Sequence, residues 1–473
     1  IPNDEHQNKE CDNNEPDTKD WRIYPTTVIQ RLHQNFGLFP HCNEVNDVAS
    51  HGSSDGGHIF IALSSNLPPA SGLSTSSALV TAFFLGLDAH LSLTKSNAYR
   101  QAIGEDGSDN AVYNLSTYLG NVENGRDYIV GNSVLKGTVQ GGVGTFGGSE
   151  DHAAILLGKS GEMRLLSFCP TRPASIDWES VANDVISSEI FDGKTNLNSL
   201  ESTSQDSVVR PSPDLTFVIA YSGAKAEKAG GTDGDTDASI GYNSASDLTR
   251  QAFDAYFAGG DSEGLESTQT LADAIRWERK HLGTESIKAC MSSRIKAGAL
   301  AMNRNTSPDR EVNATALVQR FQHFYDESEC LVPLAAHAIS KEKYDLLGPI
   351  VDASHRGAVN SLKNQIEETA WLPLWARGME NSLQLKPLSV GNTNPQDVKH
   401  QTNQPQRIKA LAASAFGAGF GGSCWALVYR HHAQKFANQW QNAYDERFPP
   451  TNNGSGLTRE FFLTSPGPGT FCV

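Results

Sequence analysis

The first place where the chain could do chemistry is a loop rich in glycine and serine at residues 68–78 (PPASGLSTSSA). It precedes a long apolar run, which predicts a helix from about Ser76. Free N–H groups and the positive end of the helix dipole suit anions, and Gly72 allows close approach of the backbone. The four hydroxyls of residues 74–77 could contact phosphate oxygens or Mg²⁺. The alternative is a serine-rich N-cap on an ordinary helix.

A second glycine-rich segment, residues 141–152 (GGVGTFGGSEDH), ends in two carboxylates and a histidine. It leads into the apolar residues 153–157 (AAILL), which are predicted to form a strand. Asp151 is therefore expected at a strand entrance, where a rigidly held carboxylate can accept a proton or orient a hydroxyl. A solvated turn with incidental acids is the alternative interpretation of this segment by itself.

The third segment, residues 416–425 (FGAGFGGSCW), formally contains the pattern G-x-G-x-x-G. A dinucleotide-binding fingerprint requires a strand before this pattern and a helix after it. Here the alanine-rich residues 408–416 are predicted to be helix-like, and a strand is predicted at 424–429. Because the order is reversed, a Rossmann dinucleotide site is not expected.

The elements that must position these segments are strands alternating with long helices in two halves, which indicates an α+β fold. A boundary is expected in the polar stretch 193–213, which ends at two prolines. The expected helices are 22–36, the run from about Ser76, 111–122, most of 243–380 and a helix to about 446. The expected strands are 58–64, 153–157, 214–221, 424–429 and an extended stretch at 461–464.

Composition limits the class of protein. The chain has 473 residues, enough for two large lobes or for three domains of roughly 150 residues. Its formal net charge of −16 disfavours a nucleic-acid binder, and no apolar run approaches the ~18 residues of a membrane span. Seven cysteines stand singly, so neither a zinc site nor a disulfide framework is suggested, and a cytoplasmic location is expected. Residues 1–20 are predicted to be a flexible polar segment.

The three segments in this order resemble the GHMP small-molecule kinases, and most closely their galactokinase branch. The family's second motif, Pro-x-x-x-Gly-Leu-Ser-Ser-Ser, is matched by residues 68–76 with Thr75 in place of one serine. Galactokinases carry Gly-x-x-Asp-Gln, and residues 148–152 match this pattern with His152 in place of glutamine. The third motif, Gly-Ala-Gly-x-Gly-Gly, is present at residues 417–422.

The resemblance covers roughly residues 21–470 and implies a two-lobed GHMP kinase fold. An N-terminal, nucleotide-binding α+β domain, incomplete, is expected over residues 21–205, and a ferredoxin-like α+β C-terminal domain over residues 214–473. The family's first motif, Gly-Arg-x-x-x-x-Gly-Glu-His-x-Asp-Tyr, is absent from the sequence. An N-terminally truncated fragment is one explanation, and a divergent protein that has lost catalysis is the other.

By the same resemblance the protein is expected to use ATP and Mg²⁺ to phosphorylate a monosaccharide. The resemblance implies galactose or a related sugar, phosphorylated at its anomeric hydroxyl. Ser76 and Glu123 would ligate Mg²⁺, although Glu123 could instead be an exposed helix-end acid. Asp151 would orient or deprotonate the sugar hydroxyl, and Tyr242 would contact the sugar unless it is a packed core tyrosine. The residues expected to bind nucleotide are Pro68, Ser71, Gly72, Leu73, Ser74, Thr75, Ser76 and Ser77, and those expected to contact substrate are Asp151, Tyr242, Gly419, Gly421 and Gly422.

Two other functions stay open at this point. One is a non-catalytic sensor of sugar and nucleotide on the same fold, which the missing first motif favours and which Asp151 and the Ser76 loop disfavour. The other is a GHMP kinase of an isoprenoid precursor or of homoserine, against which Tyr242 and Asn243 count. The expected partner is a small sugar, with no nucleic acid and no membrane, and the expected state is a monomer or weak homo-oligomer. Residues 382–407 are polar and have no functional interpretation.

Overall fold

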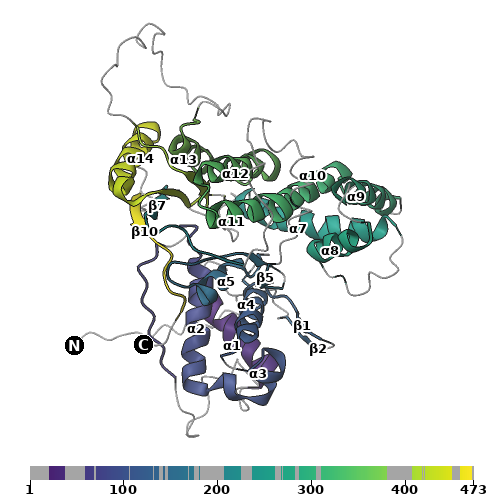
Figure 1. The fold of residues 1–473 in the computed structure, drawn as a ribbon. Helices are drawn as coiled ribbons and strands as arrows, with labels where there is room; N and C mark the ends of the chain where they lie inside the picture. Colours follow the sequence, from purple (N-terminus) through teal and green to yellow (C-terminus); the bar gives the residue numbers. More distant parts are fainter. Residues whose placement is uncertain are drawn as a thin grey trace, which may run out of the picture.

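The computed structural model places two groups of elements, α1 to α5 with short hairpins and a four-stranded sheet with α7 to α14 (Figure 1). The segment 1–20, the stretch 193–206 and residues 382–406 lie outside the residues that the structure describes. Within 237–245 only the backbone is described. The described residues are 21–37, 59–68, 71–105, 107–131, 133–137, 142–143, 147–168, 170–174, 181, 207–224, 237–260, 268, 270–282, 287–304, 311–380, 407–417, 419, 421–449 and 459–470.

The described residues of the N-terminal half are mainly helical, as the sequence predicts near 22–36, 76 and 111–122. The apolar faces of these helices pack around a core that includes Leu32, Phe84 and Leu119. The helices are α1 (Ile23–Phe36), α2 (Thr75–Leu91), α3 (Asn97–Ala102), α4 (Asp109–Glu123) and α5 (Glu150–Leu157). The short strands pair antiparallel as β1 (Tyr128–Val130) with β2 (Ser133–Leu135), β3 (Met163–Arg164) with β6 (Val208–Val209), and β4 (Leu166–Ser167) with β5 (Arg172–Pro173).

Two strand predictions in this half are wrong. Residues 59–64 form no strand, and Phe60 among them is 92% exposed; an alternating pattern makes a strand only where another strand pairs with it, and no described residue does. Residues 153–157 belong to helix α5, which begins three residues earlier. The acidic residues Glu150 and Asp151 stabilise its first turn, and a short apolar run cannot be assigned to strand or helix by periodicity alone.

The C-terminal half contains a four-stranded antiparallel sheet. Its strands are β7 (Leu215–Tyr221), β8 (Ala412–Ala415), β9 (Ser423–Tyr429) and β10 (Glu460–Thr464), in the order β10-β7-β9-β8. Helices separate β7 from β8 and β9 from β10, so the strand order and connections are those of a β-α-β-β-α-β, ferredoxin-like unit. The predicted strands at 214–221, 424–429 and 461–464 and the ferredoxin-like C-terminal half are thereby confirmed, and the protein is of the α+β class.

The prediction of a helix-like run at 408–416 is wrong, because β8 occupies its second half. Ala412 packs into the core on one face of the sheet and Ala413 into the core on the other, so small side chains here serve two tightly packed faces. The third glycine segment therefore connects two strands, β8 and β9. No helix follows it, and the dinucleotide fingerprint is still not met.

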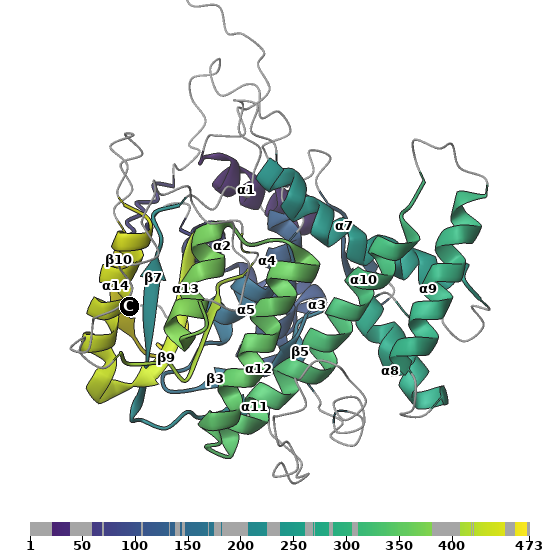
Figure 2. The ribbon, with the colours of Figure 1, turned by 90° about the horizontal axis from the view of Figure 1, so that it is seen from above.

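Helices cover both faces of this sheet. Val218 and Ala220 face Trp371 of α13 and Trp440 of α14, whereas Phe217 and Ile219 face a cavity of about 580 Å³ under α11 and α12. Of the helices in this half, α8 and α9 lie at the side away from the sheet (Figure 2). No helix in the described part of the chain is long and apolar enough to cross a membrane. The helices are α7 (Asp237–Ala258), α8 (Leu271–Leu282), α9 (Ile287–Asn303), α10 (Ala314–Tyr325), α11 (Val332–Ser340), α12 (Tyr344–Gly357), α13 (Glu367–Arg377) and α14 (Ala433–Arg447), with π-helical turns η4 (Asp326–Leu331) and η5 (Ala358–Leu362).

Arg377 joins α12, α13 and β8. Its Nε and Nη2 donate to the two carboxylate oxygens of Asp352, each at 2.9 Å, and its Nη1 donates to the backbone oxygens of Ala410 (2.7 Å) and Leu411 (2.9 Å). Asp352 is only 6% exposed, so its charge depends on this partner. The guanidinium thus connects α12 and α13 to the backbone just before the edge strand β8.

We expect Arg377→Met to lower the free energy of unfolding by about 3–5 kcal/mol, because it leaves the Asp352 carboxylate buried without its cation. Urea unfolding measures this. Arg276→Met is the matched control, since Arg276 pairs with Asp273 at the surface and should cost less than about 1 kcal/mol. Adding Asp352→Leu to Arg377→Met should restore much of the loss, and equal losses in the two arginine variants would contradict the prediction.

Candidate active site

The first glycine segment leads into α2 through a left-handed turn. Gly72 has φ +75° and Ser74 has φ +54°, and the helix starts at Thr75. The Thr75 hydroxyl donates to the backbone oxygen of Pro68 at 3.3 Å, which closes the loop. Ser74 stands at the N-cap position but its side chain makes no capping hydrogen bond. The alternative of an ordinary serine N-cap therefore does not describe this helix end, whose backbone N–H groups and dipole suit an anion.

The third glycine segment packs directly against this loop. The Ser423 hydroxyl donates to the backbone oxygen of Ser71 at 2.8 Å. Gly422 has φ +90°, and a Cβ atom on it would lie 2.4 Å from that same Ser71 oxygen and 2.9 Å from the Cα of Gly72. On the other side, the Gly422 oxygen accepts hydrogen bonds from both the backbone and the hydroxyl of Ser222 at the end of β7. The β8–β9 connection therefore sets the position of the Ser71–Gly72 loop.

We expect Gly422→Ala to displace this loop and to lower stability by about 1–3 kcal/mol more than Gly417→Ala does. Both glycines have positive φ, but a Cβ on Gly417 meets nothing within 4 Å, so the control isolates the effect of the close contact. Thermal unfolding of the two variants measures the difference. Equal losses in both variants would mean that only the backbone conformation matters.

Glu123, the last residue of α4, lies beside the amino end of α2. Its Oε2 accepts a hydrogen bond from the Ser77 hydroxyl at 3.0 Å and lies 3.1 Å from Nε2 of His152, the third residue of α5. The residue is only 6% exposed, so the alternative of an exposed helix-end acid is wrong. One carboxylate thus connects the amino ends of α2 and α5 to the carboxyl end of α4.

The contacts of Glu123 favour the charged form of its carboxylate. Burial by itself raises its pKa, but the contacts with His152 and the hydrogen bonds from Ser76 and Ser77 outweigh burial, so the pKa lies below the ordinary value of a glutamate. Ser76 and Glu123, which were expected to hold Mg²⁺, are therefore in contact. A carboxylate and a hydroxyl are oxygen donors of the kind that Mg²⁺ prefers, and Mg²⁺ in nucleotide sites takes one or two carboxylates together with substrate phosphates. The residues present fit that ion.

Asp151 lies in the first turn of α5, not at a strand entrance. It is partly exposed, and its side chain makes no hydrogen bond with the described residues. Its neighbour His152 is 1% exposed and is the residue that contacts Glu123. Close packing fixes this helix start, because a Cβ on Gly120 of α4 would lie 2.9 Å from Ser149. Asp151 thus lies at the amino end of α5, which the contact between His152 and Glu123 joins to α4.

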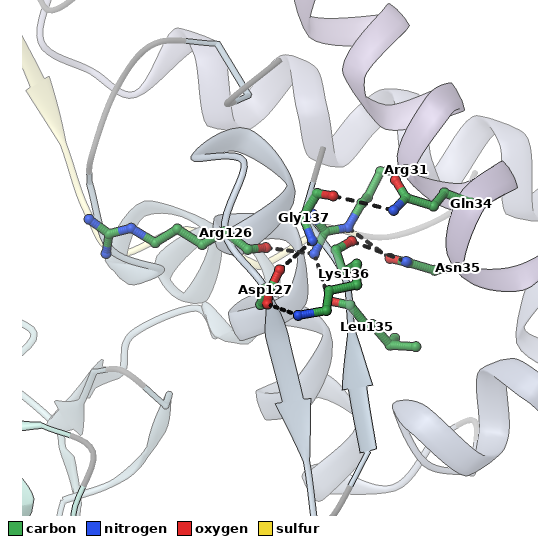
Figure 3. A network of polar contacts seen from close by, with 8 residues as sticks. All are labelled: Arg31, Gln34, Asn35, Arg126, Asp127, Leu135, Lys136 and Gly137. Atoms are coloured by element: carbon green, nitrogen blue, oxygen red, sulfur yellow. Dashed lines mark hydrogen bonds and ion pairs between the residues drawn. The ribbon is translucent and has the colours of Figure 1, made fainter. Parts of the chain in front are cut away.

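A buried arginine secures the chain just after Glu123 (Figure 3). Arg31 of α1 is 0% exposed, and its Nη2 donates to the backbone oxygens of Arg126 (2.6 Å) and Leu135 (3.2 Å), on the two sides of the β1–β2 hairpin. Desolvation lowers the pKa of this guanidinium from its ordinary value. Asp127 pairs with Lys136 across the same hairpin at 2.9 Å. The exit of α4 is therefore held from both α1 and the hairpin.

The remaining expected site residues have different surroundings. Gly421 and Gly422 contact the Ser71–Gly72 loop, whereas Gly419 lies against the backbone of Asn364, whose oxygen would be 2.1 Å from an added Cβ. Tyr242 belongs to α7, but its side chain lies outside the described residues. Pro68 and Leu73 are part of the loop, and both are partly buried.

Two contacts in the candidate site were not predicted from the sequence. In the sequence His152 differs from the galactokinase pattern only by replacing a glutamine, whereas in the structure its Nε2 contacts Glu123. Ser423 follows the third glycine motif, and its hydroxyl holds the loop at Ser71. The replacement of the pattern's glutamine by a histidine next to Asp151 is the sequence feature that could have pointed to this contact. Nothing local distinguishes Ser423 from any other serine in a glycine-rich stretch.

Comparison with known proteins gives the following findings. Residues 27–122 match the family model described as the GHMP kinases N terminal domain. The crystal structure of Lactococcus lactis galactokinase complexed with galactose is similar at 17% sequence identity and a TM-score of 0.44, over 85% of this chain and 68% of that chain. Among curated proteins, none matches this sequence. The range matched by the family model contains the Ser71–Ser77 residues and ends one residue before Glu123.

Proposed function

We propose that the protein is a small-molecule kinase, which transfers the γ-phosphoryl group of ATP to a hydroxyl of a monosaccharide. The premise is the match of residues 27–122 to the GHMP kinases N terminal domain. The observation that carries the proposal is the meeting of two helix amino ends, of α2 and α5, at the carboxylate of Glu123. Such helix ends attract phosphate, and a neighbouring carboxylate provides a place for its metal.

In this proposal the amino end of α2 binds phosphate oxygens through backbone N–H groups, and the Ser71–Gly72 loop lets the nucleotide come close to the backbone. Ser76 and Glu123 would hold Mg²⁺, which would neutralise charge on the phosphates. The network of Ser77 and His152 favours the charged form of the Glu123 carboxylate and orients it. Phosphoryl transfer depends mainly on positioning and charge neutralisation, and these contacts provide both.

Asp151 accepts the proton of the sugar hydroxyl as its oxygen bonds to the γ-phosphorus and the bond to the leaving ADP breaks. The carboxylate has no hydrogen-bond partner among the described side chains, so it is available to a substrate hydroxyl. The resemblance of residues 148–152 to the galactokinase pattern supports galactose or a related monosaccharide, phosphorylated at the anomeric hydroxyl, as the substrate.

The test is ADP release from Mg-ATP by the whole chain across a panel of monosaccharides, with mevalonate and homoserine as representatives of other GHMP substrates. We expect one monosaccharide to stimulate turnover, and phosphorus NMR of the product to show the phosphate on the anomeric oxygen. If only homoserine or mevalonate stimulates turnover, the substrate is not a sugar and belongs to that other class of GHMP substrate. If ATP binds but no compound stimulates ADP release, the protein is a sensor and the kinase proposal fails.

A further inference from the structure

A second cavity, of about 670 Å³, lies among α9, α10, η4, α12 and η5. None of the residues assigned to the candidate active site lines it. Its volume is in the range of cavities that take small metabolites. The charged side chains of its lining are the four cations Lys288, Arg320, Arg356 and Lys363 and the two carboxylates Asp326 and Glu327.

The cations of this cavity outnumber the acids, in a chain whose formal net charge is −16. Asp326 neutralises the charge of Lys288, because the lysine Nζ lies 2.5 Å from the Oδ1 of this aspartate. Burial raises the pKa of Glu327, although its hydrogen bond with Ser354 and the charge of Arg320 act against the shift. Arg356 and Lys363 form no ion pair with any acid in the described part of the chain. The cavity therefore carries positive charge that the described residues do not neutralise.

His323 adds a neutral donor to the cavity. The Arg320 Nη1 lies 3.2 Å from His323 Nδ1, and a guanidinium only donates, so Nδ1 accepts and the ring proton resides on Nε2. Burial, followed by the charge of Arg320, lowers the pKa of His323 to about 4, which keeps the ring neutral at neutral pH. The Nε2 atom is buried and has no hydrogen-bond partner among the described residues.

A buried N–H group without an acceptor is unfavourable, and a ligand oxygen that accepts its hydrogen bond would remove this penalty. Gly357 also lines the cavity and packs against the ring, because a Cβ atom at that position would lie only 3.2 Å from the His323 Nε2. The histidine donor and the surplus cations therefore converge on the same lining.

We infer that this cavity is an anion site that binds a phosphate group, with Arg320, Arg356 and Lys363 as its cations and the His323 Nε2–H as its neutral donor. Guanidinium groups match the oxygens of phosphate in pairs, and a lysine adds a point charge. The phosphate group can belong to inorganic phosphate or to a small phosphomonoester such as a sugar phosphate. The inference does not depend on the proposed kinase activity, since no residue of the active site takes part.

The experiment is calorimetric titration of the whole chain with inorganic phosphate in one arm and galactose 1-phosphate in the other, at constant ionic strength maintained with chloride. The cavity variant is Arg356→Gln with Lys363→Gln. The matched control is Lys159→Gln with Lys435→Gln, which changes the net charge equally at exposed positions outside the cavity. We expect the wild type and the control to bind alike, and the cavity variant to bind about tenfold more weakly or worse.

The two arms separate the sources of the phosphate group: binding of inorganic phosphate alone assigns the site to free phosphate, and tighter binding of galactose 1-phosphate assigns it to a phosphomonoester. Absence of binding in both arms, or equal weakening in the control, overturns the inference. So does binding that survives in the cavity variant but is lost in Ser76→Ala, which would assign the anion to the α2 helix end. Circular dichroism checks folding, and Lys363→Gln alone, at an exposed residue, repeats the test if the double variant unfolds.

Discussion

Asp151→Asn is expected to lower kcat by about 10²–10⁴-fold while the Kd of ATP changes by no more than a few fold. Asparagine keeps the shape of the side chain and is tolerated in a first helical turn, but it cannot accept the proton of the attacking hydroxyl. Because His152, not Asp151, makes the contact with Glu123, the nucleotide and metal end of the site should stay intact. Steady-state ADP release and calorimetric titration with ATP measure the two quantities.

Glu150→Gln is the matched control for this variant. Glu150 is an exposed acid in the same turn of α5, so the substitution removes the same charge one residue away. We expect its kcat to stay within a few fold of the wild type. Unchanged turnover in Asp151→Asn would remove Asp151 from the mechanism, and a parallel loss of ATP affinity would assign it a structural role.

Glu123→Gln is expected to weaken the Mg²⁺-dependent part of ATP binding by about 10- to 100-fold and to reduce turnover at a fixed Mg²⁺ concentration accordingly. The amide oxygen can still accept the hydrogen bond from Ser77, so α2 and α4 should stay together. It carries no charge, however, and is a poor ligand for a hard cation. Titration with ATP in the presence of Mg²⁺ and in the presence of a chelator measures the effect without depending on turnover.

The control for Glu123→Gln is Glu105→Gln, which removes an exposed carboxylate from the same half of the chain. It should leave the Mg²⁺ dependence unchanged. If Glu123→Gln also leaves that dependence unchanged but lowers the thermal stability, then Glu123 is only a structural link between α2, α4 and α5, and the metal must be held elsewhere.

Local patterns predicted most of the elements that carry the site. The apolar run after the serine cluster predicted α2, and the strands at 214–221 and 424–429 were recognisable because buried strands read as short apolar runs bounded by turn residues. The same reasoning failed at 153–157 and 408–416, where short runs of small apolar residues are compatible with either helix or strand. In both places the packing partners, and not the run itself, determine the conformation.

The residues that can take part in the site are readable from the chain alone: hydroxyls at a helix start, an acid after a glycine-rich turn, and glycines that permit positive φ. Which of them come into contact depends on how the elements pack. The hydrogen bond from Ser423 to Ser71 joins residues 352 positions apart, and the Ser77–Glu123–His152 contacts join the ends of three helices. Such contacts depend on how whole elements pack, because the free energy that creates them comes from the burial of many side chains and is not encoded in any one segment.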